Sequence, residues 1–264
     1  MRYELAFFGC GNMGGTLLAA AAKTVDGKKI AAIDPDKTKT AHFAALCGAA
    51  EEDALSAAKE CRFFVIGVKP QAYEPALRPL FSVLSGRKDL TAITMGAGVS
   101  VNAVKKLTGC DSVIRIMPNT PAAVGKGVIL YCADGVDEDA VAAFTRDFAA
   151  AGDLVPVKET EIDAASALTG CGPAFCYLFI EALADAAVEC GIPRATALRF
   201  AAETVEGSAA MAKEFGNPAA LKDAVCSPGG TTIAGVHALE QGAFRATTMN
   251  AVVAAYQKTL ALKK

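Results

Sequence analysis

The sequence predicts an α/β fold in which a doubly wound, mostly parallel sheet is followed by an all-helical C-terminal domain. Up to about residue 157, short apolar β-rich runs alternate with Ala-rich segments of helical character. This alternation is typical of right-handed βαβ units, whose helices cover both faces of the sheet. From residue 160 onward no convincing run with period two is found. We therefore expect two domains, residues 1–157 and residues 158–264.

The elements of the first domain follow from these runs in chain order. The predicted strands are Glu4–Phe8, Lys29–Ile33, Phe63–Val68, Leu90–Met95, Ser112–Ile116, Gly127–Cys132 and Leu154–Val157. The predicted helices between them are Met13–Thr24, Lys37–Leu46, Glu52–Lys59, Ala72–Leu84, Val101–Leu107 and Glu138–Ala150.

The second domain is predicted to be helical because its apolar residues recur with helical spacing. Thr160–Asp163 is typical of a helix start, Gly191–Pro193 of a stop, and Asn217-Pro218 of a new start. Much of this region lacks a strongly charged helix face, so we expect part of its apolar surface to meet another subunit. The alternative is that these helices only wrap one another. The residues that share one predicted helix face are Phe175, Phe179, Leu183, Ala187 and Cys190.

Charge and histidine content argue against three classes of function: nucleic-acid binding, binding to a membrane surface and a histidine-built metal site. The chain has 264 residues, 53% of them hydrophobic, and a net charge of −2 without basic runs. A nucleic-acid partner and a polybasic membrane patch are therefore not expected. The two histidines, His42 and His237, leave little material for a histidine-built metal site, so we expect no metal.

Cysteine usage and hydropathy predict a cytoplasmic protein. The nine cysteines are an odd number without a Cys-x-x-Cys pair, and most lie among small or apolar neighbours, as reduced thiols do. The weakly charged stretch Leu5–Ala22 resembles a signal peptide, but Asn12 and four glycines interrupt it. No later segment reaches about 18 unbroken apolar residues, so a membrane span is not expected.

A glycine-rich turn near the N-terminus predicts a dinucleotide site of the Rossmann type. Residues Gly9–Gly14 have the G-x-G-x-x-G spacing, follow a predicted strand and open a predicted helix. The first glycine permits a tight turn, the second lets a pyrophosphate approach the backbone, and the third lets the helix pack closely on the strand. The anion then lies at the helix N-terminus. The residues expected to bind the cofactor here are Gly9, Cys10, Gly11, Asn12, Met13 and Gly14.

Asp34 ends the second predicted strand, 25 positions after Gly9, where an acidic residue commonly binds the adenosine ribose hydroxyls. This carboxylate favours NADH, because it would repel a 2′-phosphate. Lys37 and Lys39 favour the opposite preference, since they can neutralise a phosphate. Asp34 is also a candidate cap of the following helix, with Asp36 as its competitor. The sequence leaves NADPH and NADH open.

Three further loops follow predicted strands, where ligands bind in open α/β sheets. Gly67-Val68-Lys69-Pro70 carries a lysine suited to a cofactor phosphate or ribose, although a solvated lysine is an equal alternative. Met95–Gly98 is small enough for a flat ring to lie against backbone. Ile116–Pro121 contains two prolines that stiffen a loop with two hydrogen-bonding side chains.

The strongest pattern in the helical half is Cys226–Ala234, in which a predicted helix ends in Ser-Pro-Gly-Gly and a new one begins at paired threonines. Such a turn exposes backbone N–H groups at a helix N-terminus, which suits a carboxylate, and adds threonine hydroxyls. An ordinary turn with Thr231 as N-cap is the alternative. Similarly, Gly170–Gly172 permits close approach of a cofactor or of another helix. Cys171 has no recognisable base nearby, which speaks against a nucleophile.

Together these motifs resemble pyrroline-5-carboxylate reductases. The resemblance extends in order over nearly the whole chain, and its most specific part is the Ser-Pro-Gly-Gly-Thr-Thr segment. The segments that carry it are Gly9–Gly14, Val68–Pro70, Arg115–Pro121, Glu181–Ala187, Leu221–Asp223, Ser227–Ile233 and Gly242–Arg245. The family reduces 1-pyrroline-5-carboxylate to L-proline with NADPH or NADH, the last step of proline biosynthesis.

The resemblance implies roles for particular residues. It implies that the Thr232 hydroxyl bonds the substrate ring nitrogen and that the backbone of Gly230, Thr231 and Thr232 holds the substrate carboxylate. It also implies homodimers with interlocked helical domains, often assembled into decamers. Besides the loop Gly9–Gly14, the residues implied to line the cofactor are Val68, Lys69, Pro70, Gly96 and Ala97.

The sequence departs from the family pattern at a few positions. Thr169 and Cys171 stand where serines are common, and Phe175 stands where tyrosine is frequent. Asp34 replaces the small hydroxyl residue of NADPH-preferring relatives. These departures leave the reaction in place but leave the cofactor preference open.

Two other functions share part of the pattern. A β-hydroxyacid dehydrogenase has a similar glycine-rich loop and a helical second domain, but it needs a proton-transferring lysine. No lysine occurs between Lys158 and Lys213. A non-catalytic dinucleotide sensor would keep Gly9–Gly14 and would not need Ser227–Thr232.

Overall fold

The computed structural model describes residues 1–262, which form two compact units. The first comprises Met1–Gly170 and the end of the last helix from Tyr256 onward, and the second comprises Cys171–Ala255. The last strand of the described chain ends at Pro156, and every later regular element in it is helical. The predicted boundary at residues 157 and 158 follows this change of secondary structure, whereas the compact units divide after α8 (Glu159–Thr169).

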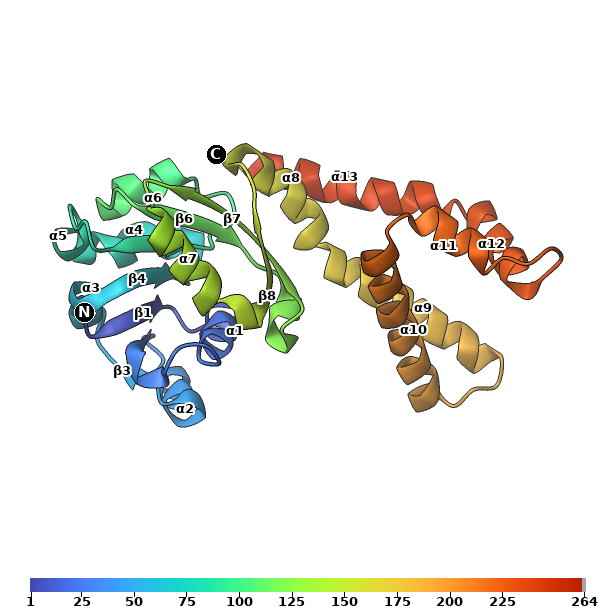
Figure 1. The fold of residues 1–264 in the computed structure, drawn as a ribbon, viewed down its shortest axis with the longest axis horizontal. Coiled ribbons are helices and arrows are strands. Elements are labelled where there is room, and N and C mark those ends of the chain that lie inside the picture. The colour runs from blue at the N-terminus through green and yellow to red at the C-terminus, as the bar shows by residue number, and fades with distance from the viewer. Residues whose placement is uncertain (263–264) are drawn as a thin grey trace. The chain divides into compact units, whose positions relative to one another are not determined.

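The first unit is built on an eight-stranded sheet with the order β3-β2-β1-β4-β5-β6-β7-β8 (Figure 1). All neighbouring strands are parallel except β6 and β7, which pair antiparallel, so the mostly parallel sheet is confirmed. Its strands are β1 (Tyr3–Phe8), β2 (Ile30–Ile33), β3 (Ala50–Glu51), β4 (Cys61–Ile66), β5 (Thr91–Thr94), β6 (Val113–Met117), β7 (Gly127–Asp134) and β8 (Gly152–Pro156).

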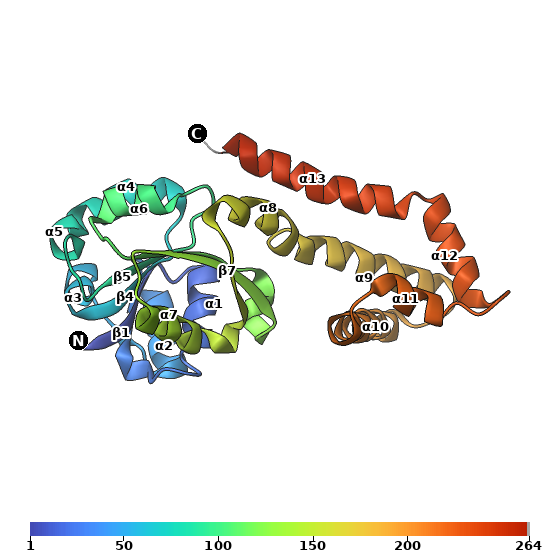
Figure 2. The ribbon, with the colours of Figure 1, turned by 45° about the horizontal axis from the view of Figure 1, so that its top comes forward.

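Helices cover both faces of this sheet, as predicted (Figure 2). Alternate residues of a strand enter different cores: Leu5 and Phe7 of β1 pack with α1, α2 and α7, and Ala6 packs with α3, α4, α5 and α6. Two hydrophobic cores therefore hold the sheet from either side. The helices are α1 (Asn12–Ala21), α2 (Lys37–Cys47), α3 (Ala54–Glu60), α4 (Tyr73–Leu77), α5 (Phe81–Leu84), α6 (Val101–Thr108) and α7 (Glu138–Asp147).

Two predicted elements differ from the structure. The single helix expected over Ala72–Leu84 is four short helical segments, of which two are α4 and α5. Pro75 and Pro79 lack the N–H that a continuous helix needs, which explains the breaks. The two-residue strand β3 was not predicted, because it is too short to show a period.

The second unit consists of helices and has almost no core of its own. Among residues 171–255, the buried side chains are three alanines, Ala184, Ala197 and Ala201, where α9 packs on α10. The helices are α9 (Gly172–Glu189), α10 (Arg194–Phe215), α11 (Pro218–Ala224), α12 (Thr231–Gln241) and α13 (Phe244–Leu262), the last of which runs into the first unit.

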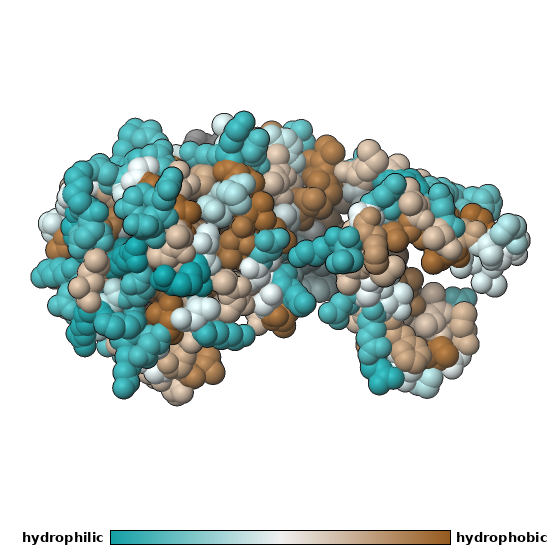
Figure 3. Space-filling model, viewed as in Figure 1, coloured by the Kyte–Doolittle hydropathy of each residue, from teal (hydrophilic) through white to brown (hydrophobic). Residues whose placement is uncertain are grey.

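Apolar side chains lie exposed along these helices, and they appear as brown patches in Figure 3. Leu178 is 65% exposed, Phe215 66% and Met249 68%. In the described chain, Glu159–Glu189 is the one helical stretch long and apolar enough to cross a membrane by length and composition. This stretch spans α8 of the first unit and α9 of the second, and exposed apolar surface of this kind also marks protein interfaces.

Candidate active site

The turn between β1 and α1 is shaped by glycines that lie backbone against backbone. Gly9 has a φ of +105°, which favours glycine. A Cβ atom on Gly14 would lie 2.2 Å from the Gly9 carbonyl oxygen, and one on Gly67 would lie 2.4 Å from the same atom. Since β1 pairs with β4, Gly67 follows β4 directly beside Gly9. These three positions therefore require glycine for packing within the chain.

Gly11 is different, because nothing among residues 1–262 fills the space beside it. A Cβ atom there would meet no atom within 4 Å, and the φ of Gly11 is −71°, which any residue adopts. Gly11 is the N-cap of α1 and no side chain caps this helix in the described residues. The free first-turn N–H groups and the open space at Gly11 form a cradle that fits a pyrophosphate.

Asp34 lies directly after β2 and is only 7% exposed. One carboxylate oxygen accepts the Cys10 backbone N–H at 2.9 Å, and the other accepts the Asp36 N–H at 3.0 Å. Lys39 Nζ lies 3.4 Å from the second oxygen. Asp34 therefore ties the glycine-rich turn to the next loop. Asp36, not Asp34, caps α2, since it accepts the Thr38 N–H.

Cys10 occupies this turn as a small apolar residue. Its side chain is 4% exposed, and burial raises the pKa of its thiol to about 11. The thiol is therefore protonated at neutral pH and is a poor nucleophile.

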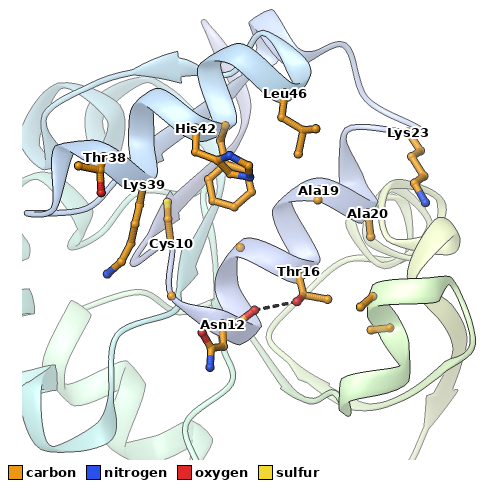
Figure 4. Close-up of a pocket in the computed structure, with 15 residues that line it drawn as sticks. Cys10, Asn12, Thr16, Ala19, Ala20, Lys23, Thr38, Lys39, His42 and Leu46 are labelled. Atoms are coloured by element: carbon orange, nitrogen blue, oxygen red, sulfur yellow. Dashed lines mark hydrogen bonds between the residues drawn. The ribbon is translucent and has the colours of Figure 1, made fainter.

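A cleft of about 550 Å³ opens beside the turn, between α1 and α2 (Figure 4). Lys39 extends from α2 toward the glycine-rich turn, and Lys23 lies at the far end of the cleft. Thr16 donates its hydroxyl to the Asn12 carbonyl at 2.7 Å and does not cap the helix. Near the glycine-rich turn, the charge of Lys39 is shared with the carboxylates of Asp34 and Asp36, at 3.4 and 3.8 Å.

The structure brings the other predicted dinucleotide residues to the same edge of the sheet. Val68, Lys69 and Pro70 follow β4, and Gly96 and Ala97 follow β5, at the carboxyl ends of parallel strands. Parallel strands present these ends on one side, where ligands of open α/β sheets bind.

Residues of β6 and of the loop after it bind α8 and β7 through buried hydrogen bonds. Asn119 is buried, donates its side-chain amide to the Thr169 carbonyl at 2.9 Å, and accepts the Val128 N–H at 2.9 Å. Arg115 is also buried and donates to Asp163 of α8 at 2.8 Å. These bonds attach α8 to the sheet.

The second glycine turn lies in the other unit, at the start of α12. Ser227 accepts the Gly230 N–H at 3.0 Å through its carbonyl, and Gly229 has a φ of +69°. Gly230 is the N-cap of α12, and no side chain of the described residues caps it. Thr231 and Thr232 are exposed in its first turn. Thr231 is thus not the N-cap, and the free N–H groups beside two hydroxyls can hold a carboxylate.

Comparisons with known proteins find matches for both parts of the chain. Residues 159–262 match a family model described as pyrroline-5-carboxylate reductase dimerisation, and residues 4–97 match one described as NADP oxidoreductase coenzyme F420-dependent. A pyrroline-5-carboxylate reductase of Pisum sativum is 37% identical, with 97% of this chain and 95% of that protein covered. The Escherichia coli K12 enzyme of that name is 37% identical over 100% of both chains.

The chain belongs to the pyrroline-5-carboxylate reductase family. Among solved structures, a pyrroline-5-carboxylate reductase from Coxiella burnetii has a TM-score of 0.91 at 31% identity, covering 100% of both chains. The Plasmodium falciparum pyrroline carboxylate reductase with NADP bound has a TM-score of 0.87 at 30% identity, covering 100% of this chain and 99% of that one.

Gly67 belongs to the loop Gly67–Pro70 noted in the sequence, but it was not predicted as a site residue. The sequence shows only a glycine directly after an apolar run. The need for glycine at this position follows from the pairing of β4 with β1. Only that pairing places it against the Gly9 carbonyl.

Gly11→Ala and Gly14→Ala should separate ligand binding from packing. We expect Gly11→Ala to leave the free energy of unfolding within about 0.5 kcal/mol of wild type but to weaken dinucleotide binding roughly tenfold or more, because its methyl enters only the open cradle. Gly14→Ala should lower the free energy of unfolding by about 2 kcal/mol or more, because its methyl meets the Gly9 carbonyl. Denaturant unfolding and NAD(P)H fluorescence titration measure the two effects. Equal loss of stability in both variants would contradict this division.

Proposed function

We propose that the protein reduces 1-pyrroline-5-carboxylate to L-proline with a hydride from NAD(P)H, the last step of proline biosynthesis. The observation that carries this proposal is the Ser227–Gly230 turn, which leaves the first turn of α12 uncapped beside Thr232. Full-length similarity to reductases of this name supports the same assignment.

The substrate is a cyclic imine that carries one carboxylate, and the chain offers a group for each part. The N–H groups of Thr231 and Thr232 suit the carboxylate, because the helix N-terminus favours negative charge. The Gly230 N–H, which the resemblance also implied, already donates to the Ser227 carbonyl at 3.0 Å, so Gly230 contributes the shape of the turn and not a donor. The Thr232 hydroxyl suits the ring nitrogen, to which it can donate as the amine forms. When bound, the reduced nicotinamide supplies the hydride. No titrating side chain is needed, since the imine accepts hydride at carbon with its nitrogen already protonated.

The proposed cofactor residues are the loop Gly9–Gly14, Asp34, Val68–Pro70, Gly96 and Ala97. Open space at Gly11 and the uncapped start of α1 support this assignment. The β-hydroxyacid dehydrogenase alternative lacks its lysine, since none occurs between Lys158 and Lys213. A non-catalytic sensor would have no use for the uncapped turn at α12.

Thr232→Ala should lower kcat by about 10- to 100-fold, because the substrate nitrogen loses its proposed hydrogen-bond donor. The Kd for NAD(P)H should change less than about twofold, since Thr232 belongs to the substrate turn. The measurement is oxidation of NAD(P)H, followed by absorbance, with the cyclic imine as substrate.

Thr232→Ser is the matched control, because it keeps the hydroxyl and should retain most of the turnover. Wild-type turnover in Thr232→Ala, or none in the unaltered protein, would overturn the assignment.

We further propose that NADH binds more tightly than NADPH. The buried Asp34 carboxylate already accepts two backbone N–H groups, and Asp36 lies beside it at the start of α2. A 2′-phosphate placed here would face two carboxylates. Lys39, which lies 3.4 Å from Asp34 and 3.8 Å from Asp36, offsets part of that charge.

Two single substitutions should move the cofactor preference in opposite directions. Asp34→Asn removes one negative charge and should shift the Kd ratio about fivefold toward NADPH. Lys39→Ala removes the compensating cation and should shift it about fivefold toward NADH. Fluorescence titration with both cofactors gives the ratio. Tighter NADPH binding by the wild-type protein would refute the preference.

We propose that the protein functions as a homodimer, on which a decamer can be built. The second unit buries only three alanines, while a groove of about 620 Å³ along α9 is lined by apolar side chains. Burial of such a surface by a second copy stabilises both copies. Burial in a dimer also accounts for the apolar stretch Glu159–Glu189 without a membrane.

We propose that the protein is cytoplasmic, because its nine cysteines are free thiols.

Leu178→Asp should dissociate the dimer, because it places a charge at an exposed position of this groove. We expect light scattering after gel filtration to give the 27.0 kDa of one chain for this variant and a multiple of it for the wild type. Leu55→Asp, at an exposed apolar position of α3, is the matched control and should keep the wild-type mass. A 27.0 kDa wild type, or an unaltered Leu178→Asp assembly, would refute the dimer.

A further inference from the structure

The loop after β5 is held by a buried polar contact that the proposed reaction does not itself require. The Tyr73 side chain rises from α4 and is only 2% exposed. Its hydroxyl lies 2.8 Å from the Thr94 hydroxyl, at the end of β5. The Thr94 hydroxyl in turn accepts the Gly96 N–H at 3.4 Å. Tyr73 of α4 thus contacts the first residues of this loop from the buried side.

The contact is tight enough to determine which residue can occupy position 96. A Cβ atom on Gly96 would lie 2.6 Å from the Tyr73 hydroxyl oxygen and 3.0 Å from its ring carbon Cζ. It would also lie 2.9 Å from a methyl group of Val99. Gly96 is therefore favoured because Tyr73, together with Val99, occupies the space that a side chain would need.

The far end of the same loop is fixed from a different helix. Glu159 of α8 accepts the Val101 N–H, at the start of α6, at 2.7 Å. Arg115 lies 3.4 Å from the same carboxylate oxygen and holds it in place. Ser100 caps α6 by accepting the Ala103 N–H. With this end anchored by Glu159, the contact of Tyr73 with Thr94 and Gly96 fixes the start of the loop, and the exposed Ala97 and Gly98 lie between the two fixed points.

We propose that Tyr73 is a positioning residue that shapes the Met95–Gly98 loop for the nicotinamide end of the cofactor. This inference rests on the proposed function, in which Gly96 and Ala97 line the cofactor. Burial raises the pKa of the Tyr73 phenol, so its hydroxyl stays protonated and remains available as a donor. A loop fixed in advance loses little entropy when the ring binds against its backbone.

Binding of NADH and of ADP-ribose to Tyr73→Phe tests the proposal. ADP-ribose is the same ligand without its nicotinamide ring. We expect Tyr73→Phe to raise the Kd for NADH about fivefold, the effect of one lost hydrogen bond. The Kd for ADP-ribose should change less than about twofold, because the glycine-rich turn is untouched. Equal weakening of both ligands, or no weakening of either, would overturn the proposal.

A suppressor experiment tests the contact itself. Gly96→Ala should weaken NADH binding by about tenfold or more, because the new methyl displaces the loop. Adding Tyr73→Phe removes the oxygen at 2.6 Å, so the double variant should bind NADH more tightly than Gly96→Ala alone. A double variant weaker than Gly96→Ala would contradict the proposal.

Glu74→Gln, at an exposed position next to Tyr73 on α4, is the control and should bind NADH as the wild type does. Thermal unfolding without ligand identifies any variant that fails to fold. Failure of the wild-type protein to bind NADH and NADPH would refute the proposed function. A wild type that binds and turns over, with an unchanged Tyr73→Phe, would refute only the role of Tyr73.

Discussion

The Gly9 carbonyl oxygen is the atom around which the first unit is arranged. Gly14 and Gly67 approach it so closely that a Cβ atom on either would lie within 2.4 Å. This approach brings the start of α1 against the carboxyl ends of β1 and β4, so the first-turn N–H groups open at the edge of the sheet. The cradle at Gly11 is a consequence of this packing, since the helix start that forms it is held by its neighbours.

Periodicity predicted most of the fold because apolar strands and amphipathic helices carry their own signal in consecutive residues. All seven predicted strands exist, with ends shifted by up to two residues. The two elements that were predicted wrongly or not at all depend on strand length and on proline, which hydrophobic periodicity does not report. Strand β3 has two residues, and the segment from Ala72 to Leu84 contains two prolines whose missing N–H groups prevent one continuous helix despite its apolar pattern.

The candidate site was predictable as a set of loops but not as a set of contacts. Glycine spacing identifies the turn at Gly9, whereas the bond from Cys10 to Asp34 joins residues 24 positions apart. The position of Tyr73 against Thr94 and Gly96 likewise exists only once α4 has packed on the sheet. Buried residues that support a site, such as Tyr73, form no recognisable motif in the sequence, because their distance along the chain from the site residues is determined by the fold.

The two units also differ in how they are stabilised. The first buries aromatic and aliphatic side chains on both faces of its sheet, while the second, taken alone, buries three alanines. Burial of a few methyl groups contributes little against the conformational entropy of ordering some 85 residues. We therefore expect order at Thr232 to depend on covering the exposed apolar surface of its unit. On the proposed dimer, association is a condition for catalysis as well as for stability, because the uncapped turn of α12 belongs to the unit that association completes.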